Sequence, residues 1–318
     1  MINTVLGEID PQELGVTYIH EHLYVSPDEL ERYYNYTLDV PSKSVEEAEL
    51  FKSAGGCTIV DMTPLAYGRN PEALRLISQQ AGINVLCVTG FHKDLWLPRW
   101  FDSLSDEEIT RELTREIEGG IGFSKVKPAA VKIGTSLGKV TEREKRAIRL
   151  AVPVASRHHL PIITHCDKGT MGLEQLDLLE AQGMDLSHVC LSHTDLTLDP
   201  EYMKSLMKRG AFLSFDHVGR DLAGRDVARI LLLKDYVSSG YGSKICLAGD
   251  MGKKSYFKSY GGTPGLDYIL TDFKEQLLKE ISEEDYWRML IDNPRRVLDW
   301  SYGGTPGLDY ILTDFKEQ

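Results

Sequence analysis

The chain has 318 residues, and 48 acidic against 36 basic side chains give it a formal net charge of −12. Its content of 42% hydrophobic and 26% charged residues is that of an ordinary globular protein and excludes a disordered or fibrous chain. This negative net charge argues against nucleic acid as a partner, because proteins bind phosphate backbones through basic surfaces.

Eight short apolar runs recur along the chain and predict β-strands. They lie at 16–23, 57–64, 83–91, 129–136, 160–167, 188–195, 211–218 and 244–251. Amphipathic stretches predict helices between them, at 44–55, 71–82, 141–159, 173–183, 200–210 and 224–240. Apolar strands alternating with helices predict an α/β protein with a parallel sheet, and eight such units match a (β/α)8 TIM barrel. A doubly wound open sheet is the alternative, disfavoured because no G-x-G-x-x-G follows an early strand.

The C-terminal segment 301–318 is an identical copy of 259–276. A solenoid has several repeats that differ in sequence, whereas these two copies are identical. They indicate a recent duplication or an artefact of cloning or sequence assembly. We therefore interpret residues 1–300 as one barrel domain and assign no function to the copy. In the first copy, Thr263-Pro264 is predicted to begin an amphipathic helix.

Most of the predicted strands end in a residue that can bind a metal. In the first run His20 and His22 face the same side, because side chains i and i+2 of a strand share a face. The fourth, fifth, sixth and eighth runs add Lys132, His165, His193 and Asp250. In a barrel the carboxyl ends of the strands meet at one mouth, where active sites are built. Each residue alone is more often structural, but the joint pattern predicts a metal site.

The motifs HEHL (20–23), GGCTIVDMTP (55–64), THCD (164–167), SHTD (192–195), FDH (215–217) and GDM (249–251) stand at these strand ends. Together with the fourth-run lysine they resemble the phosphotriesterase family of the amidohydrolase superfamily, over essentially all of 1–300. The resemblance implies two divalent ions, usually zinc. One ion is expected on His20, His22 and Asp250, the other on His165 and His193, with a bridge from Lys132 carboxylated on Nζ.

Carboxylation of Lys132 makes chemical sense in such a site. It turns a positive ammonium into a negative carbamate with two hard oxygen donors, which suits a pair of cations. The alternative is an uncarboxylated Lys132 that contacts substrate. Two ions would acidify a bridging water, so that hydroxide attacks the substrate and Asp250 accepts its proton.

The resemblance also gives His217 a catalytic role, that of passing this proton to solvent. The carboxylate that completes the relay in the family is missing, because Leu196 stands at the matching position. Asp195 and Asp216 are neighbouring candidates to replace it. Otherwise His217 only contacts substrate.

The loops after the strands carry the evidence on substrate. Candidate substrate-binding residues are the basic and aromatic side chains of these loops, namely Arg220, Lys253, Lys254, Tyr256, His92 and Trp96. In an acidic chain such a cluster predicts an anionic small molecule, with a solvated basic loop as the alternative. The K-K-S-Y segment (253–256) resembles the branch of the family that opens phosphorylated sugar lactones. We therefore predict a lactonase acting on sugar lactones, with or without a phosphate.

Three other functions remain open. A phosphotriesterase would prefer an apolar pocket for its uncharged substrate. A mononuclear deaminase would need a glutamate where Asp167 stands, and a non-enzymatic barrel is disfavoured by the intact ligand set. The resemblance further implies a homodimer.

The five cysteines are dispersed without C-x-x-C spacing, which indicates free thiols in a reducing compartment. The first ten residues lack the charged and apolar regions of a secretory signal, and no apolar run is long enough to span a membrane. We therefore expect a cytoplasmic protein that binds no membrane.

Overall fold

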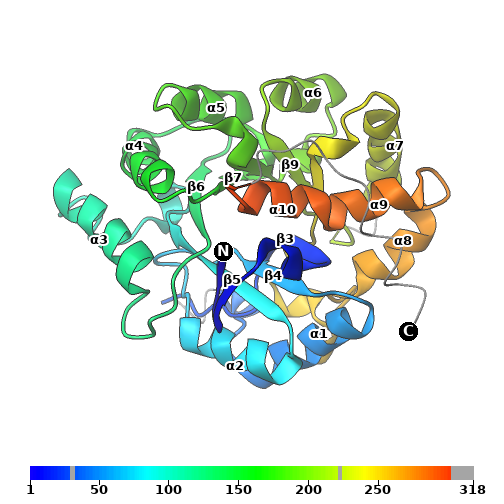
Figure 1. Ribbon diagram of the computed structural model, residues 1–318, viewed down its shortest axis with the longest axis horizontal. Helices are drawn as coiled ribbons and strands as arrows, with labels where there is room; N and C mark the ends of the chain where they lie inside the picture. The colour runs from blue at the N-terminus through cyan, green and yellow to red at the C-terminus, as the bar shows by residue number, and fades with distance from the viewer. Residues whose placement is uncertain (29–32, 221–223, 302–318) are drawn as a thin grey trace.

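Eight parallel strands form the central sheet of the computed structural model, which describes residues 1–28, 33–220 and 224–301 (Figure 1). They pair in chain order as β3 (Thr17–Glu21), β4 (Thr58–Asp61), β5 (Asn84–Gly90), β6 (Ala130–Thr135), β7 (Ile162–Cys166), β8 (Val189–Ser192), β9 (Phe212–Phe215) and β10 (Ile245–Leu247). This order confirms the predicted (β/α)8 barrel. The repeated segment lies outside the described residues from residue 302 onward.

Helices surround the sheet on its outer face (Figure 1). They are α1 (Pro41–Ser53), α2 (Pro71–Ala81), α3 (Asp106–Gly119), α4 (Glu142–Arg157), α5 (Gly172–Glu180), α6 (Pro200–Lys208), α7 (Arg225–Ser238), α8 (Asp272–Leu277), α9 (Glu283–Leu290) and α10 (Asp292–Leu298). Thr141 shows why α4 begins where it does. Its side chain accepts from the N–H of Glu144, whose carboxylate accepts from the N–H of Thr141, a capping box. Within the described chain, no helix has the length and apolar character to cross a membrane.

Apolar side chains fill one end of the barrel, so that the site must lie at the other. Ile19, Val60, Ile163 and Phe212 belong to a buried cluster that also contains Val297 of α10. Helix α10 and an unpredicted antiparallel hairpin, β1 (Ile2–Thr4) with β2 (Gly7–Ile9), lie near this end (Figure 1). The carboxyl ends of the strands are left to carry polar side chains.

The segment after β10 corrects one prediction. Helix α8 begins at Asp272 and not at Thr263-Pro264, whose peptide bond is cis. The N–H of Leu266 donates to the buried Glu47 of α1 at 3.2 Å. Because this carboxylate holds the chain against α1, the residues after Pro264 form a loop instead of a first helical turn.

Candidate metal centre and active site

A cavity of about 450 Å³ at the carboxyl ends of the strands gathers most of the predicted site residues. Its lining includes the six predicted metal ligands together with four of the other candidates: His20, His22, Lys132, His165, His193, Asp250, His217, Arg220, His92 and Trp96. The predicted substrate residues Lys253, Lys254 and Tyr256 are not among its lining residues. The residues predicted from the strand ends therefore share one cavity, whereas three of the residues predicted from the loops lie outside its lining.

His20, His22 and Asp250 lie close enough together to share one ion, with ligand atoms within 4.8 Å of one another. Nε2 of His22 lies 3.2 Å from Oδ1 of Asp250, and Nε2 of His20 lies 3.7 Å from it. The other ring nitrogens are occupied, since Nδ1 of His20 lies 2.7 Å from Ser192 Oγ and Nδ1 of His22 lies 2.7 Å from Thr63 Oγ1. Such an outer partner on one nitrogen is typical of histidine metal ligands.

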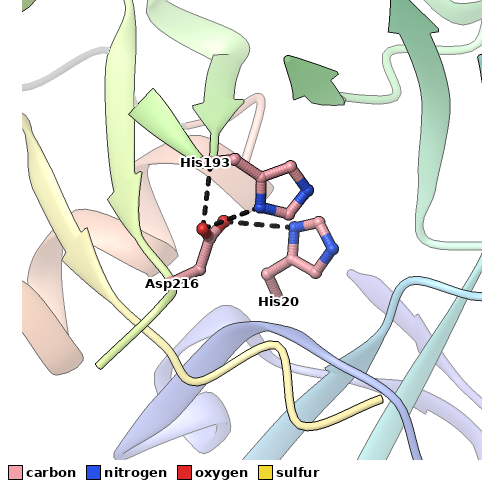
Figure 2. Close-up of side chains that lie close together, drawn as sticks. All are labelled: His20, His193 and Asp216. Carbon is pink, nitrogen blue, oxygen red and sulfur yellow. Dashed lines mark hydrogen bonds and ion pairs between the residues drawn. The ribbon is translucent and has the colours of Figure 1, made fainter. Parts of the chain in front are cut away.

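Asp216 orients a further histidine of the site (Figure 2). Its Oδ1 accepts the backbone N–H of His193 at 2.9 Å and lies 2.9 Å from Nδ1 of the same residue. Its Oδ2 lies 3.4 Å from Nδ1 of His20. The buried carboxylate therefore fixes the His193 imidazole and lies beside that of His20, which Ser192 holds, and both Nε2 atoms are left for the cavity.

His165 stands slightly apart from this group. Its ring centroid lies 4.6 Å from that of His193, yet it belongs to none of the described sets of three ligand atoms within 4.8 Å. Nε2 of His165, like that of His20, is buried and has no hydrogen-bond partner among the described residues. Buried nitrogens of this kind need a partner, and a divalent ion supplies one.

Lys132 on β6 completes the predicted ligand set. Its side chain is 1% exposed, and Nζ donates to the carbonyl oxygen of Met62 at 2.8 Å. Burial lowers the pKa of Lys132 to about 8, which brings the uncharged amine, the form that reacts with carbon dioxide, within reach of neutral pH. Burial likewise lowers the pKa of His20 and His165, keeping both imidazoles in the neutral form that binds metals. The donors present therefore fit divalent ions.

Asp250 and His217 are joined by an arginine. Arg220 donates to Oδ2 of Asp250, and its Nη1 lies 2.9 Å from Nε2 of His217. Nδ1 of His217 lies 3.1 Å from Asp216 Oδ1 and 3.7 Å from Asp195 Oδ1. Burial opposes the charged form of His217, but the two carboxylates outweigh it and raise the pKa of the imidazole. Both candidate relay carboxylates therefore face this histidine.

Two buried ionisable residues that support the site were not predicted. Glu21 accepts the backbone N–H of Gly249 at 2.5 Å and that of Met251 at 2.8 Å. Arg229 of α7 donates to Asp195 at 2.6 Å. An acid between two histidines was the available signal for Glu21, whereas nothing in the helix pattern distinguished Arg229 from a surface arginine.

Lys253 and Tyr256 lie behind Arg220. The Arg220 guanidinium carbon is 5.0 Å from the ring centroid of Tyr256, and Lys253 Nζ is 5.2 Å from the same centroid. Burial opposes ionisation of Tyr256, but the two cations outweigh it and lower the pKa of its hydroxyl. Lys253 also lies over Tyr36, at 4.6 Å, and Tyr36 lines the cavity. Lys253 and Tyr256 therefore touch two residues that line the cavity, Arg220 and Tyr36, but do not line it themselves.

Of the remaining predicted substrate residues, two line the cavity and Lys254 does not. Lys254 is turned toward Asp39, 3.8 Å from its Oδ1. His92 and Trp96 stand in an aromatic wall with Tyr67, whose ring centroid lies 5.4 Å from His92 and 4.7 Å from Trp96. An aromatic wall therefore lines one side of the cavity, while Lys254 is not among the lining residues.

Comparisons with known proteins agree with this architecture. The model of the phosphotriesterase family matches residues 1–298. The phospho-furanose lactonase of Mycoplasmopsis synoviae is 31% identical over 320 residues, which cover 93% of this chain and 90% of that protein. A lactonase structure from Listeria monocytogenes has a TM-score of 0.87 at 31% identity, covering 94% of this chain and 98% of that one.

A third relative is the phosphotriesterase homology protein from Escherichia coli, whose crystal structure holds phosphate in the active site. It has a TM-score of 0.87 at 32% identity, covering 92% of this chain and all (100%) of that one. The similarity of these relatives to this chain extends over the whole barrel and is not limited to a single local motif. The chain belongs to the phosphotriesterase family.

Proposed function

We propose that the protein is a binuclear metal-dependent lactonase that opens sugar lactones carrying an anionic group such as a phosphate. The observation that supports this substrate is the place of Arg220, whose guanidinium lines the cavity beside Asp250 and His217. An arginine fork suits phosphate and carboxylate oxygens. Relatives named as a phospho-furanose lactonase and a lactonase, and one with phosphate in its active site, point the same way.

The proposed ligands are those that the sequence suggested: His20, His22, Lys132 carboxylated on Nζ, His165, His193 and Asp250. Divalent ions held there, zinc in our proposal, supply Lewis-acid polarisation of the ester carbonyl and make hydroxide available near neutral pH.

The protein's own groups manage the protons. Asp250 accepts the proton released during attack on the carbonyl and returns it to the alkoxide oxygen of the opened ring. The acid group of the product therefore forms already ionised. The net proton is the one that water gives up in forming hydroxide, and His217, held by Asp216 and Asp195, would pass it to solvent. Arg220 holds the anionic substituent in place while the ring opens. Each turnover releases one proton, so that a pH indicator reports the reaction.

A second candidate is hydrolysis of phosphotriesters. The observation in its favour is the aromatic wall along one side of the cavity, in which the ring centroid of Trp96 lies 4.7 Å from those of both Tyr33 and Tyr67. Such a wall suits an uncharged aromatic ester.

One panel of substrates tests the proposal. The zinc-loaded protein is given phosphorylated sugar lactones, the same lactones without phosphate, and the triester paraoxon. We expect hydrolysis of the phosphorylated lactones at the highest kcat/KM, and an Arg220→Met variant with a KM raised for these but not for neutral lactones. Turnover of paraoxon with no hydrolysis of any lactone would overturn the proposal in favour of the second candidate.

Three properties of this lactonase are also part of the proposal: a homodimer, a cytoplasmic location, and no binding of nucleic acid. The acidic net charge supports the last of these. Light scattering coupled to size exclusion measures the mass of the assembly, and a monomer would contradict the proposed dimer.

A further inference from the structure

A second charged pair lies in the active-site cavity, apart from Arg220 and Asp250. Nζ of Lys93 is 2.7 Å from Oδ2 of Asp167, and both residues line the cavity. Their side chains are 19% and 22% exposed, so the pair can still be reached from the cavity. Among the described residues, neither side chain bonds to a predicted metal ligand. This pair therefore takes no part in the proposed metal site or in its proton relay.

The backbone on both sides of the pair is fixed. The N–H of Lys93 donates to Nδ1 of His92 at 2.7 Å. A Cβ atom added to Gly134 of β6 would come within 2.7 Å of the Lys93 nitrogen, so the loop after β5 packs directly on the neighbouring strand. The carbonyl oxygen of Asp167 accepts the N–H of Thr170 at 3.1 Å and its hydroxyl at 2.8 Å. The main chain that carries the two charged groups is thus held in place, and their ion pair holds the side chains together, as a preorganised binding site requires.

The barrel places Lys93 across the cavity from Arg220. Lys93 follows β5, Asp167 follows β7, and Arg220 follows β9. In a closed barrel of eight strands, β5 and β9 are four strands apart and stand on opposite walls. The cavity therefore has an arginine on one wall and the Lys93 ammonium on the opposite wall, while the Asp167 carboxylate, followed by Lys168, lies at a strand midway between them.

We propose that Lys93 and Asp167 bind two adjacent hydroxyl groups of the lactone ring and select polyhydroxylated substrates. This inference rests on the proposed lactonase function and specifies its substrate. A hydroxyl both donates and accepts, so one can donate to Asp167 while its neighbour accepts from Lys93.

The test compares two substrates and one double variant. The substrates are a five-membered sugar lactone 5-phosphate with adjacent ring hydroxyls and its dideoxy counterpart without them. The variant Lys93→Met/Asp167→Leu removes both polar groups and leaves no unpaired charge. A matched control, Lys204→Met/Asp235→Leu, removes a pair of similar length, 2.8 Å, outside the cavity.

We expect the wild-type protein to prefer the hydroxylated lactone by about 100-fold or more in kcat/KM, since sites built to bind a hydroxyl reject analogues lacking it. The double variant should lose most of this preference through a raised KM for the hydroxylated lactone, with the dideoxy lactone changed less than about threefold. The control should keep the wild-type preference. If the first variant unfolds at a lower temperature than wild type, Lys93→Gln/Asp167→Asn removes both charges but keeps polar side chains, and it should weaken the preference in the same direction.

If the double variant lost equal factors of kcat/KM on both lactones, the pair would only hold two loops together. That result would overturn the inference but not the proposed lactonase function. If the wild-type protein opened neither lactone, the proposed function would fail. Calorimetric titration with the two ring-opened acids then decides the inference separately. Tighter binding of the hydroxylated acid by wild type than by the variant supports it, and equal affinities overturn it.

Discussion

The carboxylate of Glu21 holds the peptide groups on both sides of Asp250. It accepts the N–H of Gly249 at 2.5 Å and that of Met251 at 2.8 Å, while the N–H of Asp250 donates to the carbonyl of His20 at 3.1 Å. Asp250 has a positive φ of 45°, a conformation that non-glycine residues adopt rarely. Because β3 and β10 are the two ends of the sheet order, these bonds close the barrel where the proposed catalytic carboxylate stands.

Replacing Glu21 by alanine should therefore lower both stability and activity. The change leaves two buried N–H groups without an acceptor, at a cost of about 1–3 kcal/mol each. Urea unfolding of the metal-free protein measures the loss. Glu49→Ala, an exposed position on α1, is the control and should stay close to wild type. A Glu21→Ala protein as stable as wild type would show that Glu21 does not hold this junction.

Replacing Asp250 by asparagine should remove activity and keep the fold. Asparagine has the size of aspartate but cannot take up the proton, so hydrolysis should fall by at least about 100-fold. Thermal unfolding and metal content establish that the variant is otherwise intact. Full activity together with full metal content would refute the proposed proton acceptor.

Asp216 should control metal affinity through His193. Asp216→Asn weakens the charge-assisted contacts that orient the imidazole, and the loss of such outer partners lowers metal affinity by about 10- to 100-fold. Competition with a chelating dye gives the dissociation constant. An unchanged constant would mean that the backbone alone positions His193.

The metal-free protein should become more stable as the pH rises above about 8, because of Lys132. The pKa of Lys132 is about 8 in the folded chain against 10.5 for a free lysine. Between these values the unfolded chain binds more protons than the folded one, so the free energy of unfolding rises with pH, by at most about 1.4 kcal/mol per unit.

Urea unfolding across this window measures the slope, and Lys132→Met should flatten it. The substitution keeps a side chain of similar length in the buried site without a group that titrates. A slope that is the same in wild type and variant would assign the effect to other groups.

The sequence predicted the fold and the gathering of the strand-end residues for one physical reason. Each strand is apolar and buried, so a histidine, lysine or aspartate at its carboxyl end stands out, and barrel geometry brings such ends together. His20, Lys132 and Asp250 are far apart in the chain but line one cavity. Their convergence follows from the strand count alone.

The partners of these residues could not be predicted in the same way. Ser192 contacts His20 and Thr63 contacts His22 only because of the register in which the neighbouring strands pair. Sequence patterns do not fix this register at single-residue precision. The loop after β10 was misjudged for a related reason. Its path depends on Glu47, a buried carboxylate of α1 that binds Ser259 and Leu266 across the fold.

Metal content measured together with activity tests the central claim most directly. The protein is stripped with a chelator and reloaded with zinc, after which bound metal is counted by mass spectrometry and lactone hydrolysis is followed on the same sample. A binuclear centre predicts two ions per chain, no hydrolysis in the stripped protein and recovery in step with the metal bound. Lactone hydrolysis that persists in the fully stripped protein, or a reloaded protein that binds no metal, would contradict it.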